Sequence, residues 1–406
     1  MIKKIQAKRL RLGMFIHDLD LGWMDHPFMK GKFKLTSNND LQKILSLKLQ
    51  EVYIDTDKGL DVESGQDAAE VRTEVKKALG ELTIPYPVKD LKIPLKEEYQ
   101  QAAKVKREAS LVVTKMMEDA RLGKQIEIEQ LNPVVEGLVR SVFNNQNALL
   151  GMVRIREMDK YTFEHSVSVA VLLTSFCKAL GMSHEIIHQV GIGGLLHDIG
   201  KTKVPLAILN KPGRLDEDEF TIMRRHVNYS QDILETAKEV SEISSGIIYE
   251  HHERYDGSGY PNAKSVDGIS LYGKMAAIVD VYDALTSNRC YHQGKSPHWV
   301  LGKLIEWSKY HFQPDLVQQF IRCIGIYPVG TLVLLKSGRL GMVVESNEKD
   351  LLKPVIKLVY DKNKNRHLPA KLLDLAKQPS EPFDRIVGSE MPEDYRLRIE
   401  VLLEPI

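Results

Sequence analysis

Residues 190–201 have the sequence Val-Gly-Ile-Gly-Gly-Leu-Leu-His-Asp-Ile-Gly-Lys, in which a small, apolar segment ends in two ionisable side chains, His197 and Asp198. Apolar segments of this kind are buried in folded proteins, so the imidazole and the carboxylate are carried into the interior. Burying two ionisable groups is costly unless a metal ion or another partner compensates for the lost hydration. Because the sequence from about residue 150 to residue 325 has helical periodicity, we expect a buried polar site among helices.

Histidines and aspartates recur on both sides of this segment at intervals of 25 to 32 residues. That interval is about the length of one helix plus the connection to the next helix. Each helix can therefore bring one side chain to a shared centre. The residues in this series are His165, His197, Asp198, His226, His251, His252 and Asp280. A single histidine on an apolar helix is more often an ordinary core or surface residue, but the complete series favours a metal site.

Imidazole and carboxylate groups suit Fe, Mn, Ni or Zn, and the residues do not distinguish among these metals. Five histidines and two aspartates exceed what one tetrahedral ion needs. A carboxylate of Asp198 that bridges two ions would use the whole set. Two ions a few ångströms apart can activate a water and neutralise charge on the attacking and leaving oxygens, which is the chemistry of phosphodiester cleavage.

A second segment begins at the pair His251-His252 and ends in Gly257-Ser258-Gly259-Tyr260-Pro261. A helix end followed by a turn explains the glycines and the proline, but it does not explain the paired histidines. Lys201 lies one turn beyond His197, so it projects on the same side as the ligands. There it can hold a phosphate oxygen or be a solvated lysine, and the spacing leaves both interpretations open.

The zinc-peptidase pattern H-E-x-x-H also occurs, at residues 184–188. It follows Ser183, which has the character of a helix N-cap, so the pattern falls on the polar first turn of a helix. Zinc peptidases also need a third ligand downstream and an active-site cleft. The pattern is short enough to arise by chance, and we reject it as a site.

The composition argues against several other classes of protein. Lys plus Arg number 56 and Asp plus Glu number 55, and this balance argues against a nucleic-acid binder. The three cysteines are far apart, which argues against disulfides and thiolate zinc sites and fits a reducing cytosol. No signal peptide is evident, and the longest apolar run, residues 167–182, is too short and too polar to span a bilayer. We therefore expect a cytoplasmic protein with neither DNA nor a membrane as its partner.

A length of 406 residues predicts two or three domains, and the fold class is mainly α. We expect a small β-rich N-terminal domain, a linker with connecting helices, a helical catalytic domain and a β-rich C-terminal extension, at residues 1–65, 66–149, 150–325 and 326–406. The patterns predict helices at Asp40–Leu49 and Leu95–Leu122 and after an Asn132 cap, strands at residues 51–55, 331–336, 340–345 and 354–361, and an extended linker at residues 83–94.

These motifs resemble those of the HD-GYP family, a branch of the HD phosphohydrolases. The resemblance spans about residues 150–325, and the first 62 residues look like a small β-rich domain of unknown function that often precedes it. The motifs that carry it are His197-Asp198-Ile199-Gly200-Lys201, Asn210-Lys211-Pro212-Gly213, Gly259-Tyr260-Pro261, residues 280–286, Leu12-Gly13-Met14 and residues 52–55.

The resemblance implies a helical HD-type metal-dependent phosphohydrolase bundle that hydrolyses cyclic di-GMP to pGpG, GMP or both, with a water activated by two metals. It implies two divalent ions per chain, Fe or Mn ahead of Ni or Zn, held by the seven residues of the series above. Asp198 and Lys201 would be catalytic, and Lys201 and Arg289 would bind phosphate. The Gly259-Tyr260-Pro261 loop would be an interaction surface for diguanylate cyclase domains.

Two departures from the family pattern affect these expectations. Some members hold a third metal through a Glu one turn before the first histidine, where this chain has Tyr161, so we expect two metals. Where many members have a second basic residue for the substrate, this chain has His292, and Lys295 can take over that role. The alternatives are a cyclic di-GMP receptor or scaffold with weak or no catalysis, and a hydrolase of another cyclic dinucleotide. The sequence leaves the oligomeric state open, a homodimer included.

Overall fold

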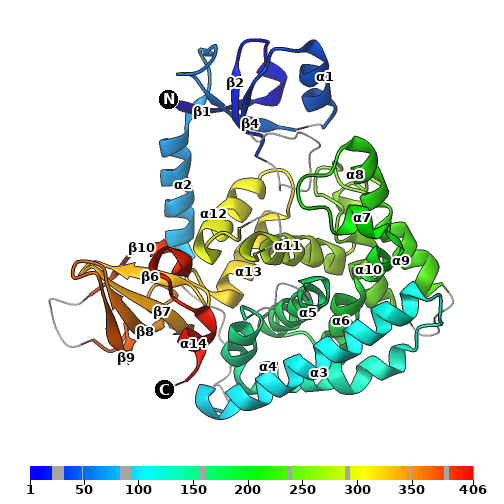
Figure 1. Cartoon of the computed structure of the whole chain (residues 1–406), viewed down its shortest axis with the longest axis vertical. Helices are drawn as coiled ribbons and strands as arrows, with labels where there is room; N and C mark the ends of the chain where they lie inside the picture. Colours follow the sequence, from blue (N-terminus) through cyan, green and yellow to red (C-terminus); the bar gives the residue numbers. More distant parts are fainter. Residues whose placement is uncertain are drawn as a thin grey trace.

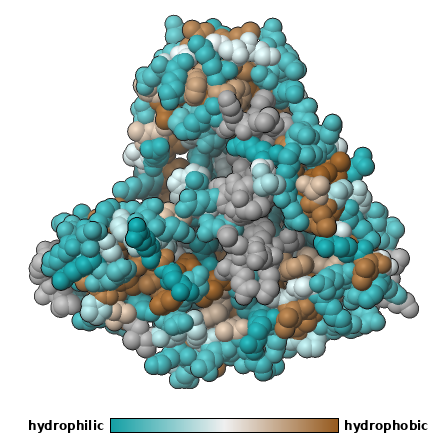
Figure 2. All heavy atoms as spheres, in the orientation of Figure 1, coloured by the Kyte–Doolittle hydropathy of each residue, from teal (hydrophilic) through white to brown (hydrophobic). Residues whose placement is uncertain are grey.

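The computed structural model of the chain contains an N-terminal sheet, a helical body and a C-terminal sheet (Figure 1). It describes residues 1–20, 32–47, 49–82, 93–155, 161–235, 237, 240–288, 293–347, 349–378 and 384–405. Every helix within these ranges is too short or too polar to span a bilayer. The face drawn in Figure 2 is mostly hydrophilic, and its hydrophobic residues form separate patches.

The N-terminal sheet has five antiparallel strands in the order β3-β2-β4-β1-β5. Isoleucines such as Ile5, Ile16 and Ile54 are buried in a small core that belongs to this sheet. Helix α1 begins after Ser37, whose side chain caps it, and adds Ile44 to the same core. The elements are β1 (Ile2–Gln6), η1 (Ala7–Arg9), β2 (Phe15–Asp18), β3 (Phe33–Lys34), α1 (Asn38–Ser46), β4 (Glu51–Asp55) and β5 (Gln66–Asp67).

The helical body begins with α2, which leaves the N-terminal sheet and packs against α12 (Figure 1). Its first elements are α2 (Ala68–Glu81), α3 (Leu95–Arg121), η2 (Ile128–Leu131), α4 (Asn132–Met152), α5 (Tyr161–Ala179), α6 (His184–Leu196), η4 (Ile199–Lys203) and α7 (Leu206–Leu209). The body continues with α8 (Glu217–Arg224), α9 (His226–Leu234), α10 (Glu242–Glu250), η5 (Val266–Gly268), α11 (Leu271–Thr286), α12 (Pro297–Trp307) and α13 (Pro314–Ile324).

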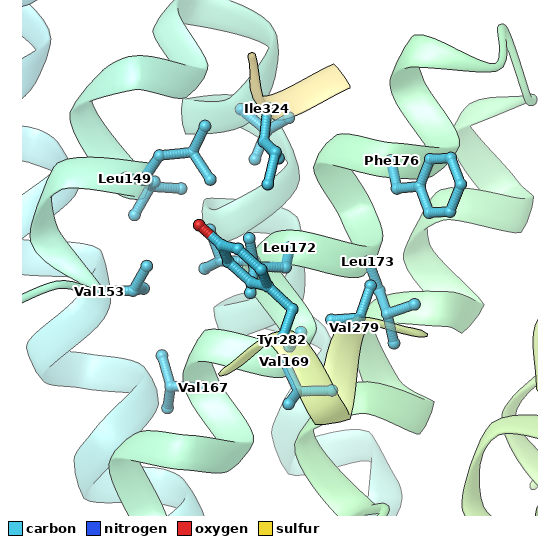
Figure 3. Close-up of a cluster of buried hydrophobic side chains, with 14 of the residues drawn as sticks. Leu149, Val153, Val167, Val169, Leu172, Leu173, Phe176, Val279, Tyr282 and Ile324 are labelled. Carbon is cyan, nitrogen blue, oxygen red and sulfur yellow. The ribbon is translucent and has the colours of Figure 1, made fainter. Parts of the chain in front are cut away.

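Helix α5 is the central helix of the body, and α4, α6, α11 and α13 pack around it. Residues 164–177 of α5 are all buried, so the apolar side chains of this helix are not confined to one face. Gly194 allows α6 to approach α5 closely, since a Cβ atom there would lie 2.6 Å from Cα of Ala170. Figure 3 shows Tyr282 of α11 among the apolar side chains of this core, with Leu172 of α5 beside it. The central helix therefore sets the position of the helices that carry the ionisable residues.

The C-terminal sheet also has five antiparallel strands, in the order β10-β6-β7-β8-β9. One face, which includes Leu332 and Met342, joins the hydrophobic core of the helical body. The other face, which includes Val343 and Ile356, forms a separate cluster. The elements are β6 (Leu332–Leu335), β7 (Arg339–Glu345), β8 (Val355–Asp361), β9 (Arg366–Asp374), β10 (Ile386–Glu390), η6 (Pro392–Tyr395) and α14 (Ile399–Leu403).

A buried ion network joins the N-terminal sheet to α12. Glu306 of α12 accepts a hydrogen bond from Nζ of Lys4 in β1. Asp20 accepts hydrogen bonds from Nζ of Lys303 at 2.7 Å and from Nε1 of Trp307 at 3.0 Å. Each buried carboxylate thus meets donors from the other part of the molecule, which offsets the cost of removing it from water. The N-terminal sheet is therefore attached to the helical body by specific polar contacts.

The expected fold class, a helical protein with β-rich ends, is confirmed. The strand at residues 51–55 and the helix over Leu95–Leu122 also occur, within one residue of the predicted ends. Two details were wrong: Asn132 is the first residue of α4 rather than its cap, and residues 61–83, for which no element was predicted, contain β5 and α2. The extended linker predicted at residues 83–94 lies almost entirely outside the described residues.

Candidate metal centre

The helical body brings together all seven residues of the His/Asp series. Their positions all fall at or near helix ends, except for Asp280 in the middle of α11. All seven side chains are buried. They are His165 in the first turns of α5, His197 and Asp198 directly after α6, His226 at the start of α9, His251 and His252 directly after α10, and Asp280. Three groups of ligand atoms lie close enough together to hold an ion. Two of them share no residue, His165 with His197 and Asp280, and His226 with His251 and His252, and the third, His197 with Asp198 and His251, overlaps both.

The carboxylate of Asp198 lies between these two groups. Its Oδ2 lies 3.3 Å from Nε2 of His197 and 3.6 Å from Nε2 of His165. Its Oδ1 lies 3.4 Å from Nε2 of His226 and 3.9 Å from Nε2 of His251. One oxygen therefore faces each group, which is the arrangement that a bridging carboxylate needs.

Backbone carbonyls orient three of the histidines. In each case Nδ1 donates to the carbonyl oxygen three residues earlier, so the proton is held on Nδ1 and the lone pair is on Nε2. The pairs are His197 with Gly194 at 2.9 Å, His226 with Met223 at 2.7 Å and His251 with Ile248 at 2.9 Å. These bonds follow from placing each histidine at or next to a helix end, where a carbonyl of the last turn is available.

His165 is oriented by a side chain that the sequence reasoning missed. Oδ2 of Asp283 accepts a hydrogen bond from Nδ1 of His165 at 2.6 Å. The signal was the spacing of Asp283 from Asp280, because residues three apart lie on one face of a helix. A carboxylate behind a ligand imidazole fixes its tautomer and makes the other nitrogen a better ligand.

Several polar atoms of the centre are buried without a hydrogen-bond partner in the described part of the chain, as expected for ligands of cations. Nε2 of His197, Oδ1 of Asp198 and Nδ1 of His252 are buried and make no hydrogen bond to any residue in the described ranges. Nε2 of His226 lies 3.4 Å from Nε2 of His251, so two lone pairs face each other at short range. Buried acceptors in this arrangement are unfavourable unless a positive charge lies between them. The donor set of imidazoles and carboxylates suits Fe, Mn, Ni or Zn.

Burial and charge shift the pKa values of the candidate ligands. Burial lowers the pKa of His226 to about 4 and that of His251 to about 3, so both imidazoles are neutral near pH 7. Burial alone would raise the pKa of Asp198, but the charges of Lys201 and His197 outweigh it and hold the pKa well below its ordinary value. His226, His251 and Asp198 are therefore ready to bind a cation without releasing a proton. Burial alone would lower the pKa of His197, but the charge of Asp198 outweighs it and raises that pKa, so a cation that binds this ring competes with a proton.

Lys201 lies beside the centre, on the side that its spacing predicted. Its Nζ donates to Oδ2 of Asp198 at 2.5 Å, and its side chain is largely buried. The tight turn that places it depends on Gly200, because a Cβ atom there would lie only 1.9 Å from the carbonyl oxygen of His226. The amide of Gly200 also donates to the hydroxyl of Ser230 at 2.9 Å. This close contact between η4 and α9 joins the two histidine groups.

The loop that contains Gly259-Tyr260-Pro261 closes over one side of the centre. The ring of Tyr260 stacks on that of His252, with their centroids 4.6 Å apart. Buried Glu253 supports the loop, because its carboxylate accepts the amides of Asn262 at 2.8 Å and Lys264 at 2.9 Å. The loop therefore presents an aromatic side chain directly beside a candidate metal ligand.

A cavity of about 250 Å³ reaches this side of the centre. Its walls include His252 and the loop from Gly257 to Tyr260, together with α8 and the end of α12. Asp20 and the C-terminal end of α1, from Ser46 to Leu49, form a further wall, although lysine 48 itself lies outside the described residues. The N-terminal sheet thus contributes directly to the space in front of the histidines, which the sequence could not predict.

The structure describes only one of the three further residues that were expected to contact the substrate, Lys295. Arg289 and His292 lie outside the described residues. Lys295 lines a different cavity, of about 330 Å³, between the end of α11 and the C-terminal region near Glu390. The rejected H-E-x-x-H pattern lies away from the seven-residue group, at the start of α6, where Ser183 is the N-cap as predicted.

Two protein families match the chain, a domain of unknown function (DUF3391) over residues 2–131 and the HD domain over residues 142–316. Cyclic di-GMP phosphodiesterase PA4108 of Pseudomonas aeruginosa is 39% identical over 98% of this chain and 94% of its own length. The 3'3'-cGAMP-specific phosphodiesterase 2 of Vibrio cholerae is 33% identical over 52% of this chain and 40% of its own length. Among solved structures, Bd1817, a HDG"Y"P protein from Bdellovibrio bacteriovorus, aligns with 79% of this chain and 98% of its own, at 17% identity and a TM-score of 0.46.

Proposed function

This chain belongs to the HD-GYP family of cyclic di-GMP phosphodiesterases, and we propose that it hydrolyses cyclic di-GMP at the seven-residue centre with two divalent metal ions. The products would be pGpG, GMP or both. The observation that supports two ions is the position of Asp198, whose two oxygens face the two histidine groups at 3.3 Å and 3.4 Å. The carboxylate of Asp280 also lies near both groups. Its Oδ1 is 3.0 Å from Nε2 of His165, and its Oδ2 is 3.8 Å from Nδ1 of His252.

The chain's own residues have distinct tasks in this proposal. His165, His197 and Asp280 would hold one ion, the other three histidines would hold the second, and Asp198 would join them. When bound, the two ions would activate a water and offset negative charge on the phosphodiester. Lys201, held beside Asp198, would bind a phosphate oxygen and neutralise the charge that develops there. The fixed tautomers keep the Nε2 atoms aimed at the centre, so no reorientation is needed during the reaction.

Metal content and turnover test this proposal on one preparation. The full chain, purified anaerobically and reloaded with Fe or Mn and then with Ni or Zn, should bind about two ions and release pGpG or GMP from cyclic di-GMP. His197→Ala and Asp198→Ala should each lower kcat by more than about 100-fold, because each removes a group that supports the developing charge. His188→Ala is the matched control, since His188 lies on the same helix outside the group, and it should keep both metals and activity.

Two other results would change the assignment. A third equivalent of metal would contradict the dinuclear proposal, because Tyr161 stands where some family members have the carboxylate that holds a third ion. Tight binding of cyclic di-GMP without turnover under any metal would make the protein a receptor.

The remaining expectations are also part of the proposal. Arg289, His292 and Lys295 would contact the substrate, and the alanine variant of each should raise KM. The Gly259-Tyr260-Pro261 loop, which is partly exposed, would bind a diguanylate cyclase domain. We propose a cytoplasmic location, which fractionation can test. Light scattering would determine the oligomeric state, which the sequence leaves open.

A further inference from the structure

The cavity beside His252 has the walls of a nucleobase site. Four aromatic side chains line it, Phe220, Tyr260, Trp307 and Phe312. Aromatic side chains bind unpaired bases by stacking on them. A single base is much smaller than a cyclic dinucleotide, so a small cavity can hold it. The cavity volume of about 250 Å³ suits one base and its immediate surroundings.

Arg224, the last residue of α8, is one of the charged residues that line this cavity, together with Asp20 and Arg254. Its guanidinium carbon lies 4.2 Å from the ring centroid of Phe220 and 5.3 Å from that of Tyr260. Two rings therefore hold the side chain by cation–π contacts. Its Nε is buried, and the side chain makes no hydrogen bond or ion pair with any residue that the structure describes. A fixed guanidinium with unused donors is the usual way in which a protein recognises a planar pair of acceptors.

Arg224 lies at the right place relative to the candidate metals. The ring of Tyr260 lies between His252 and Arg224. Its centroid is 4.6 Å from that of His252 and 5.3 Å from the guanidinium carbon of Arg224. A nucleotide whose phosphate lies at the metal centre would therefore extend its base towards this arginine. Arginine pairs in bidentate fashion with O6 and N7 of guanine, whereas adenine presents a donor at the position of O6.

The N-terminal sheet closes the same cavity from the other side. Leu47 and Leu49, at the end of α1, form part of the wall. Lys43 of α1 forms an ion pair of 2.9 Å with Glu217 at the start of α8, the helix that carries Arg224. The domain of unknown function is thus a structural part of the cavity in front of the metal centre.

We propose that this cavity is the guanine-binding pocket of the enzyme, that Arg224 reads the guanine edge, and that the N-terminal domain forms its outer wall. The inference rests on the proposed function, because it assumes that a cyclic dinucleotide binds with its phosphate at the metal centre. It adds a specificity residue from α8 and a specificity role for the N-terminal domain.

Comparison of four substrates tests the role of Arg224. We would measure kcat/KM of the metal-loaded full chain for cyclic di-GMP, 3'3'-cGAMP, cyclic di-AMP and bis(4-nitrophenyl) phosphate, which has no base. Arg224→Ala should lower the ratio of cyclic di-GMP to cyclic di-AMP turnover by about 10- to 100-fold, with 3'3'-cGAMP between them. Arg225→Ala is the matched control, because Arg225 is the next residue and its side chain is exposed. It should leave every ratio unchanged.

A second pair of variants tests the wall. Leu47→Trp would fill the cavity from the N-terminal domain and should lower kcat/KM for cyclic di-GMP by about 10-fold or more. Leu45→Trp, on the same helix but exposed and outside the cavity, should have no such effect. An equal response of the two variants would overturn the wall assignment. Circular dichroism spectra would check that every variant is folded.

The outcomes separate this inference from the proposed function. An equal loss by Arg224→Ala on all three dinucleotides would mean a phosphate contact and would overturn the guanine assignment. If the wild-type chain cleaves only bis(4-nitrophenyl) phosphate, the proposed function fails. In that case the inhibition constants of cyclic di-GMP and cyclic di-AMP against this ester still test the pocket, because they do not depend on dinucleotide turnover. A preference for cyclic di-GMP that Arg224→Ala removes would support the pocket, and no preference would refute it.

Discussion

Asp283 and His165 form a positioning pair on the buried side of the metal centre: Oδ2 of the aspartate accepts the Nδ1 proton of the imidazole at 2.6 Å. Oδ1 of Asp280, from the same helix, lies 3.0 Å from Nε2 of that ring. Two aspartates of one helix, α11, therefore contact the two ring nitrogens of a histidine that belongs to α5. This arrangement makes the orientation of the ligand depend on the packing of two core helices.

The first prediction concerns this pair. Asp283→Ala should weaken metal binding by about 10- to 100-fold, because the ring of His165 loses the acceptor that fixes its tautomer. Asp283→Asn keeps an acceptor oxygen, so its metal affinity should fall less than that of Asp283→Ala. Metal titration of the apoprotein measures both effects. Asp267→Ala, at an exposed aspartate, is the control, and a similar loss in that variant would remove the special role of Asp283.

Gly200 should not tolerate a side chain. An alanine Cβ would lie 1.9 Å from the carbonyl oxygen of His226 and 2.5 Å from the amide nitrogen of Ser230, so η4 and α9 must separate. We expect Gly200→Ala to lower the unfolding free energy by about 3 kcal/mol and to reduce metal content. Gly268→Ala, where the nearest atom is 3.6 Å away, should change neither. Urea unfolding and metal analysis give the answer, and an unchanged metal content would show that the contact can relax.

The ion network between the N-terminal sheet and α12 should be sensitive to the loss of one carboxylate. Glu306→Ala removes an acceptor from Lys4 and Tyr53, and both are buried. Breaking a buried pair on one side costs about 3–5 kcal/mol, so the unfolding transition of the N-terminal part should shift to lower urea. Glu217→Ala breaks a more exposed pair with Lys43 and should cost less than about 1 kcal/mol. Equal effects of the two variants would contradict the importance of burial here.

Asp20 should make the same junction sensitive to acid. Burial alone raises the pKa of its carboxyl, but the charges of Lys303 and Lys4 outweigh it and hold the pKa below the ordinary value. A group with a lowered folded-state pKa stabilises the fold above its unfolded pKa of about 3.9 and loses this contribution as the pH falls further. Asp20→Asn should therefore flatten the dependence of thermal stability on pH below about pH 4. A slope identical to that of the wild type would show that folding does not lower the pKa of Asp20.

The sequence predicted which side chains would meet, because their chemical types recur at the length of one helix and its return. It also predicted elements whose signals are local, such as β4 and the N-cap of α6 at Ser183. Helix α2 was missed, since its few buried residues, such as Val71, pack near α12, more than 200 residues further along the chain. Strand β9 was missed because most of its side chains are exposed, so it lacks an alternating apolar pattern.

The partners of the ligands were less predictable than the ligands themselves. Backbone carbonyls such as that of Met223 carry no sequence signal, because every residue has one. Asp283 had a signal in its helical spacing from Asp280 but no indication of the ring it would meet. Arg224 resembled an ordinary surface arginine beside Arg225, and only the tertiary position of Tyr260 distinguishes the two.

The junction between the N-terminal sheet and α12 has a consequence for the biosynthesis of the chain. Within its own domain Lys4 already has Asp20 and Glu51 as partners, but Asp20 receives its bonds from Lys303 and Trp307. On the ribosome, the sheet is complete roughly 230 residues before these two side chains are synthesised. At about 5–20 residues per second, the carboxylate of Asp20 has only its partner from the sheet, Lys4, for some 10 to 50 s. Attachment of the first domain made is thus among the last steps in forming the cavity.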